Sequence, residues 1–198
     1  MNHVAHCLLS FPNEGLLIGN FIGDYVKGST WKNFPRPVQL GIQLHRFIDA
    51  HTEHAPAMKS SIQRLRPFAG RFSAPVADIV YDHLLCSLWE QVLDKVEFEH
   101  FAQWAYAGLH AQQVWMPERL QQRWPDMMAG QFLHLYQSME GLAWTLERFA
   151  QRLSLPFHWS ELLEFLAENR AVLEEEFHQF FPDLSRQVAQ WRQEHDVA

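Results

Sequence analysis

Apolar residues recur at helical spacing along nearly the whole chain, and this pattern constrains the fold more than any other feature. No segment alternates apolar and polar residues over the length of a strand, and no Asn-Gly or Asp-Gly pair marks a hairpin. Prolines and glycines divide the pattern, which predicts helices over residues 3–9, 14–27, 35–54, 56–67, 73–94, 97–115, 118–136, 139–153 and 160–194, the last bent at Pro182. The sequence therefore predicts an all-α fold, with residues 1–198 forming a single compact multi-helix domain of about eight or nine helices.

Length and composition are those of a globular protein. The chain has 198 residues, 47% of them hydrophobic, which is enough to bury a sizeable core and excludes a disordered chain. Cys7 and Cys86 stand among apolar neighbours with no paired spacing, so we expect buried free thiols in a reducing compartment. No basic residue precedes the first short apolar run, and no apolar run approaches the ~20 residues that span a membrane. We therefore expect a soluble, cytoplasmic protein without a membrane segment.

Charge is unevenly distributed along the chain. The net charge is −7, which argues against nucleic acid as the main partner. Residues 1–72 hold eight basic and four acidic side chains, a balance of +4 that leaves −11 for the remainder. This asymmetry either steers an acidic partner to the N-terminal third or is ordinary surface variation.

One helical stretch, residues 41–54, places an imidazole and a carboxylate on the same face. His45 and Asp49 are four residues apart, so on a helix they lie one turn above each other. The pair has the ligand types that a divalent metal uses, and it also fits a buried His–Asp salt bridge.

Further polar residues stand in apolar segments of the first half. His6 lies in an apolar run, and Asn20 and Asp24 would share one face of a helix that also contains Gly19 and Gly23. Helical glycines at this spacing suggest tight packing or room for a ligand.

The segment 73–94 adds a second carboxylate pair. Asp78 and Asp82 are four residues apart, with His83 beside the second, in a strongly apolar helix. Each residue alone is explained by a structural role, but buried carboxylates need partners. The whole set, from about four helices, favours a site for Mn²⁺, Mg²⁺, Fe²⁺ or Zn²⁺ without thiolate ligands.

Four motifs in this order resemble the acyl carrier protein phosphodiesterase (holo-acyl carrier protein hydrolase) family. They cover roughly residues 1–90 and read Met1-Asn2-x-x-Ala5-His6, Gly19-Asn20-x-x-x-Asp24-x-Val26-x-Gly28, Gly41-Ile42-x-x-His45-Arg46-x-Ile48-Asp49 and Asp82-His83-x-Leu85. The resemblance implies a fold distantly similar to HD-type metal phosphohydrolases. It also implies a hydrolase of fatty acid and lipid metabolism that releases 4′-phosphopantetheine from a serine of holo-acyl carrier protein, with a divalent metal, most often Mn²⁺.

Combined with the residues themselves, the resemblance gives a hypothesis for each part of the site. The metal ligands would be His6, Asp24, His45, Asp49, Asp82 and His83. Asp24, essential in the family, would complete the metal shell or act as general base, with Arg46 as the second catalytic residue. Asn20, Lys27 and Arg46 would bind the substrate phosphate. The acidic carrier protein would dock on a basic surface formed by Lys32, Arg36, Lys59, Arg64 and Arg66.

Two other interpretations stay open at this point. The first is an HD-like phosphohydrolase acting on a nucleotide or another small phosphodiester. The second is a non-enzymatic helical binding protein in which the His and Asp clusters are structural salt bridges.

Overall fold

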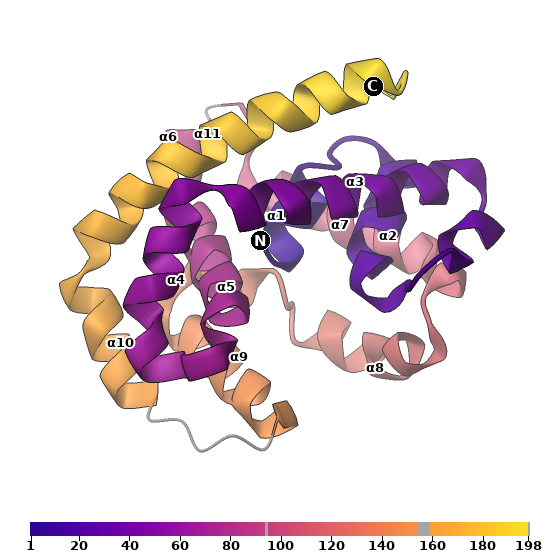
Figure 1. The fold of residues 1–198 in the computed structure, drawn as a ribbon. Coiled ribbons are helices and arrows are strands. Elements are labelled where there is room, and N and C mark those ends of the chain that lie inside the picture. The colour runs from indigo at the N-terminus through magenta and orange to yellow at the C-terminus, as the bar shows by residue number, and fades with distance from the viewer. Residues whose placement is uncertain (94, 154–158, 198) are drawn as a thin grey trace.

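The computed structural model describes residues 1–198 except 94, 154–158 and 198 (Figure 1). Its elements are α1 (His3–Leu8), α2 (Glu14–Ile22), η1 (Gly23–Tyr25), η2 (Thr30–Asn33), α3 (Arg36–His54), α4 (Pro56–Ala69), η3 (Gly70–Phe72), α5 (Ser73–Ser87), α6 (Trp89–Val92), α7 (Phe98–Ala111), η4 (Gln113–Trp115), α8 (Glu118–Ala129), η5 (His134–Gln137), α9 (Met139–Leu153), α10 (Trp159–Glu168) and α11 (Arg170–Glu194). None of the described residues forms a strand, so the predicted all-α class is confirmed.

The short helix α1 lies where two groups of helices meet. α2 packs against α3 and α7, whereas α5 packs against α4, α9 and η5. α1 packs against both α2 and α5, and the long α11 runs past α3 and α4 on the outside (Figure 1). One continuous apolar cluster joins both groups, so α1 is held in the interior of a single compact domain.

The closest helix contact is between α2 and α3, and two glycines permit it. A Cβ added to Gly19 would stand 2.2 Å from the Val38 carbonyl oxygen, and one added to Gly41 would stand 2.3 Å from that of Leu16. Both distances are far inside van der Waals contact, so any larger residue would push the helices apart. Of the two roles suggested for the helical glycines, Gly19 serves tight packing.

Several predicted helix boundaries are wrong, and the helices expected over 97–115 and 118–136 end at Ala111 and Ala129. α2 ends at Ile22 rather than near residue 27, and the chain tightens into η1, so Asp24 leaves the helical face that carries Asn20. The helix expected over 160–194 is divided at Asn169, and α11 stays helical through Pro182, where a bend was expected. The lost backbone hydrogen bond at Pro182 is outweighed by burial on either side, including Phe181 and Leu184.

The two cysteines are free and buried, as predicted. Across the described ranges, no helix is both long and apolar enough to cross a bilayer.

Candidate metal centre and the adjoining cleft

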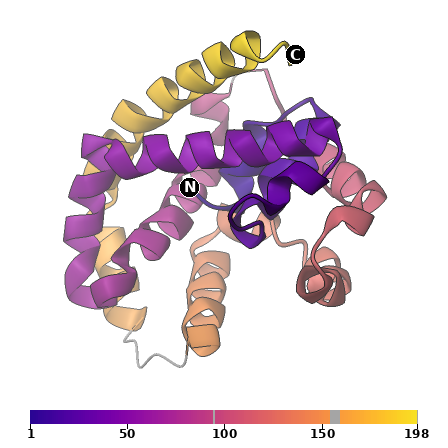
Figure 2. The ribbon, with the colours of Figure 1, turned by 45° about the vertical axis from the view of Figure 1, so that its right-hand side comes forward.

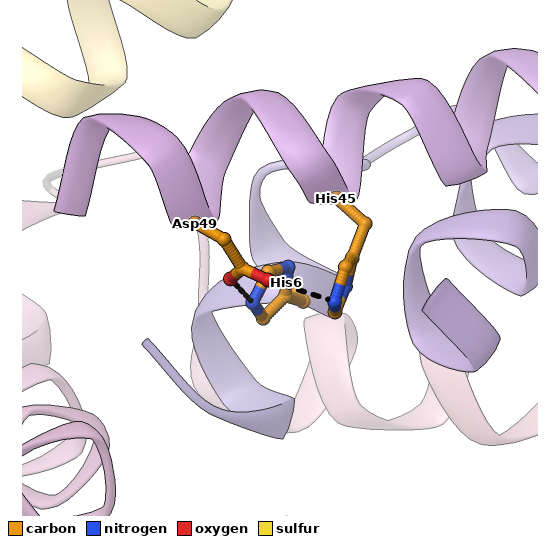
Figure 3. Close-up of side chains that lie close together, drawn as sticks. All are labelled: His6, His45 and Asp49. Atoms are coloured by element: carbon orange, nitrogen blue, oxygen red, sulfur yellow. Dashed lines mark ion pairs between the residues drawn. The ribbon is translucent and has the colours of Figure 1, made fainter. Parts of the chain in front are cut away.

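Three side chains from α1 and α3 converge in the interior. The Nε2 atom of His45 lies 3.1 Å from Oδ2 of Asp49, and the Nε2 atom of His6 lies 3.3 Å from Oδ1 of the same carboxylate. Figure 3 shows His45 and Asp49 descending from successive turns of α3 toward His6 on α1. One ligand atom from each of the three residues lies within 4.8 Å of the others, and these residues form the one such group found among the described residues.

Asn20 sets the orientation of both imidazoles. Its side-chain nitrogen donates to the His6 carbonyl oxygen at 2.8 Å, so its side-chain oxygen must face Nδ1 of His6, 2.7 Å away. His6 therefore carries its hydrogen on Nδ1. The Nδ1 atom of His45 lies 2.8 Å from the Asn20 carbonyl oxygen, so it too is a donor. When either imidazole is neutral, its Nε2 atom therefore carries a lone pair that faces Asp49.

The protonation states leave one of these contacts without a hydrogen. Burial would lower the pKa of His45, but hydrogen bonds and charges of Asp24 and Asp49 outweigh burial and raise the pKa to about 9. Burial lowers the pKa of His6 despite its contact with Asp49, so His6 stays neutral. The His6 lone pair then faces a carboxylate oxygen, and two acceptors at that distance repel each other. A divalent cation shared by the three residues removes the repulsion, so the donor set fits a metal.

Asp24 lies at the exposed side of this group. Its Oδ1 atom is 3.3 Å from Nε2 of His45, and 76% of its side chain is exposed. The hydrogen bond from His45 lowers the pKa of Asp24, so the carboxylate is charged. Gly23 makes the arrangement possible, because a Cβ there would stand 2.1 Å from the His45 ring.

The structure does not bring Asp82 and His83 into the group. The buried Asp82 carboxylate accepts backbone N–H bonds from Asn2, Val4 and Ala5 at 3.1, 2.7 and 3.3 Å, so it caps the start of α1. The Nδ1 atom of His83 donates to the Tyr136 carbonyl oxygen at 2.9 Å. Periodicity placed these residues in an apolar helix but could not show that backbone groups would satisfy them.

Asp78 also supports the N-terminal segment. Its Oδ1 atom lies 2.6 Å from the α-amino group of Met1. Asp78 and Asp82 together hold the segment that carries His6 in place. Both therefore have the structural role that the sequence allowed for each of them alone.

Of the predicted phosphate-binding residues, the buried Asn20 contacts His6 and His45, whereas Arg46 and Lys27 contact or belong to the loop after Asp24. The Arg46 guanidinium donates to the carbonyl oxygens of Val26 and Gly28 at 3.1 and 3.2 Å, so it braces the loop that follows Asp24. Lys27 is exposed on that loop. The five predicted docking residues are exposed on η2, α3 and α4: Lys32, Arg36, Lys59, Arg64 and Arg66. Among them, Arg64 is paired with Glu176 at 3.2 Å.

A cleft of about 830 Å³ opens beside Asp24, and sequence reasoning missed most of its residues. Asp24 and His3 contribute to its wall, and burial lowers the pKa of His3 to about 4, so this imidazole is neutral. Four arginines from α8 and α9 also line it: Arg119, Arg123, Arg148 and Arg152. Their spacing could have revealed them, because each helix carries like charges at i and i+4, a destabilising arrangement within an otherwise acidic region.

The fold and the site define an all-helical protein with a candidate His–His–Asp metal centre. The chain belongs to the acyl carrier protein phosphodiesterase family, whose model matches residues 1–184. It is 28% identical over 193 residues to the acyl carrier protein phosphodiesterase of Escherichia coli O157:H7, an alignment that covers 96% of this chain and 98% of that protein.

Other relatives with the same name are similar over the same length. Identity is 26% over 188 residues to the proteins of Enterobacter sp. (strain 638) and Yersinia pestis, covering 95% of this chain and 97% of each relative. No solved structure matches the chain. The likeness to HD-type phosphohydrolases therefore stays a prediction.

Proposed function

We propose that this chain is a cytoplasmic, metal-dependent acyl carrier protein phosphodiesterase. It would hydrolyse the phosphodiester between 4′-phosphopantetheine and a serine of holo-acyl carrier protein, giving apo-acyl carrier protein and free 4′-phosphopantetheine. Family membership and the relatives' names support the substrate. The observation that carries the chemistry is the convergence of His6, His45 and Asp49, because the neutral His6 presents a lone pair to the Asp49 carboxylate where a saturated salt-bridge network would have a hydrogen.

His6, His45 and Asp49 would hold the ion, Mn²⁺ in this proposal, with Mg²⁺ and Fe²⁺ as alternatives. When bound, such an ion lowers the pKa of a coordinated water and neutralises charge on phosphoryl oxygens. Asn20 would keep both imidazoles in the tautomer that ligation needs. In this proposal Asp82 and His83 support α1 and η5 instead of binding metal.

Asp24 would act on the attacking water. Its carboxylate is charged, exposed to the cleft and 3.3 Å from the His45 ligand atom. It would take a proton from the water as the oxygen bonds to phosphorus. The bond from phosphorus to the serine oxygen breaks, and that oxygen gains a proton from solvent. Arg46 and Lys27 would act through the loop beside the phosphate, Arg46 by bracing it.

The activity is tested by intact mass. Holo-acyl carrier protein incubated with the protein and Mn²⁺ should lose its ~340 Da prosthetic group, as expected for phosphodiester hydrolysis. Asp24→Ala should abolish the loss while the helical circular dichroism is unchanged, and Asp183→Ala, an exposed carboxylate on α11, serves as the matched control. Retained activity in Asp24→Ala would remove this residue from the mechanism.

The same assay separates the alternatives. Turnover of small phosphodiesters or nucleotides without turnover of holo-acyl carrier protein would identify a different phosphohydrolase. No bound or activating metal, together with no hydrolysis, would favour a non-enzymatic binding protein.

A further inference from the structure

Four arginines face one cleft from two helices. Arg119 and Arg123 lie one turn apart on α8, and Arg148 and Arg152 lie one turn apart on α9. All four are exposed, and all four line the 830 Å³ cleft. Figure 2 shows the two helices apart from each other in the lower part of the molecule, α8 in salmon and α9 in orange.

The cationic groups have few partners of their own. Within the described ranges, none of the four makes an ion pair shorter than 4.0 Å, and Arg148 instead lies over the Trp144 ring at 5.0 Å. Burial lowers the pKa of Arg152, and the nearby charges of Arg123 and Arg119 lower it further. Three carboxylates also line the cleft, Asp24, Asp78 and Asp126, and Asp78 is already paired with the Met1 α-amino group, so the four basic groups outnumber the acidic ones. Repulsion of this kind is relieved when an anionic surface binds.

The cleft adjoins the candidate metal centre through Asp24. Asp24 forms part of its wall and lies 3.3 Å from His45. None of the five basic residues first expected to dock the partner lines this cleft: Lys32, Arg36, Lys59, Arg64 and Arg66. A partner bound to the cleft arginines would therefore bring one of its side chains close to Asp24, beside His45. A partner bound to α4 would not occupy this cleft.

We propose that the cleft between α8 and α9 is the docking site for the acidic helical surface of the carrier protein around its modified serine. This inference rests on the proposed function, from which the identity of the substrate comes. The charge of the cleft selects the occupant, because a phosphodiester carries a single negative charge and the pantetheine arm beyond it is uncharged. Four arginines match the polyanionic surface of a protein better than either.

Direct binding tests the docking site without depending on turnover. The probe is fluorescently labelled apo-acyl carrier protein, titrated with the full-length protein at low ionic strength and followed by anisotropy. The cleft variant Arg119→Glu/Arg123→Glu should weaken binding by about 10-fold or more, as for reversed charges in a complementary interface. The matched control, Lys59→Glu/Arg66→Glu on α4, changes the charge equally and should alter affinity by less than about 3-fold.

A second variant keeps the test decisive if α8 is disturbed. Arg148→Glu lies on α9 and should also weaken binding of apo-acyl carrier protein. Circular dichroism confirms that each variant is folded. Equal weakening by cleft and control variants, weakening by the control alone, or no binding by the wild-type protein would each overturn the docking site. Binding that fits the proposal, in a protein that does not release 4′-phosphopantetheine, would instead refute the proposed function.

Discussion

The protein contains two groups of histidines and carboxylates, one where α3 meets α1 and one on α5, and they are built in opposite ways. On α5, Asp82 receives three backbone N–H bonds and Asp78 faces an α-amino group. Between α1 and α3, the neutral His6 presents an acceptor to the Asp49 carboxylate, which is itself an acceptor, while the protonated His45 donates to the same carboxylate. The carboxylates of the first group have their donors, whereas the His6–Asp49 contact of the second group has no hydrogen and fits a bound cation.

The difference shows that residue types alone do not distinguish a metal site from a structural network. What distinguishes them is whether each buried acceptor already has a donor. The two groups should therefore fail differently when altered: the α5 group through the stability of the fold, and the α1–α3 group through metal binding and turnover.

The largest effect is expected from Asp49→Ala. Turnover of holo-acyl carrier protein should fall roughly 1,000-fold, equivalent to about 4 kcal/mol of activation free energy, because the shared carboxylate ligand is lost. Its side chain is 47% exposed, so the free energy of unfolding of the metal-free protein should change by about 1 kcal/mol or less. Turnover assays and urea denaturation measure the two quantities. A large loss of stability with near-normal turnover would assign Asp49 to the structural class.

Asp82→Ala should give the reverse result. Removing this fully buried carboxylate leaves the N–H groups of Asn2, Val4 and Ala5 without their acceptor, which should cost about 3 kcal/mol of unfolding free energy. Turnover per folded molecule should stay within a few-fold of wild type. Urea denaturation measures the loss. Asp82→Asn keeps one acceptor oxygen, so its free energy of unfolding should lie between those of the wild type and Asp82→Ala. A folded Asp82→Ala protein that binds no metal would place Asp82 among the ligands.

A smaller effect is expected when the support of the imidazoles is removed. Asn20→Ala deletes the oxygen that orients His6 and should weaken metal affinity by about 10- to 100-fold. Ser10→Ala is the matched control, because Ser10 contacts the Asn20 side chain and the His6 carbonyl oxygen but not the imidazole. Isothermal titration with Mn²⁺ compares the variants, and equal affinities in both would contradict a positioning role for Asn20.

The smallest effect concerns pH. The folded-state pKa of His45 is raised from 6.5 to about 9, so its stabilising contribution is complete below pH 6.5 and is lost as the pH rises through about 9. In metal-free protein this loss should be on the order of 1 kcal/mol, because solvent screens the exposed Asp24 and Asp49 carboxylates. The stability difference between wild type and His45→Ala should shrink over that window. A difference that grows from pH 6.5 to 9 would contradict the assignment of the proton to His45.

Metal binding has the opposite pH dependence. Because ligation requires the neutral imidazole, Mn²⁺ affinity should rise as the pH rises toward 9.

The sequence was sufficient to predict the helical class and the convergence of His6, His45 and Asp49. Helical period and i, i+4 spacing are local properties, and they fix which side chains share a face of α3. The roles of Asp82 and His83 depend on backbone groups that lie far away in the sequence, Val4 for one and Tyr136 for the other. No periodicity encodes such contacts. The helix end at Ile22, which separates Asp24 from the face of Asn20, was also missed, although the His45 ring packs so closely against Gly23 that only glycine fits there.

The cleft arginines could not be predicted from net charge, because the N-terminal third is basic and the remainder of the chain, which contains these arginines, is acidic. Their region is acidic overall, and only the packing of α8 and α9 around a cleft gathers its basic residues. Local charge balance is therefore a poor guide to a surface assembled from two helices.

The central claim is that His6 and His45 are metal ligands, and the most direct test is pulsed electron paramagnetic resonance of Mn²⁺ added to the protein. The electron spin echo should be modulated by imidazole ¹⁴N, and the modulation should weaken in both His6→Ala and His45→Ala while remaining unchanged in His83→Ala. Bound Mn²⁺ without ¹⁴N modulation, or with modulation that depends on His83 and neither of the others, would contradict the account.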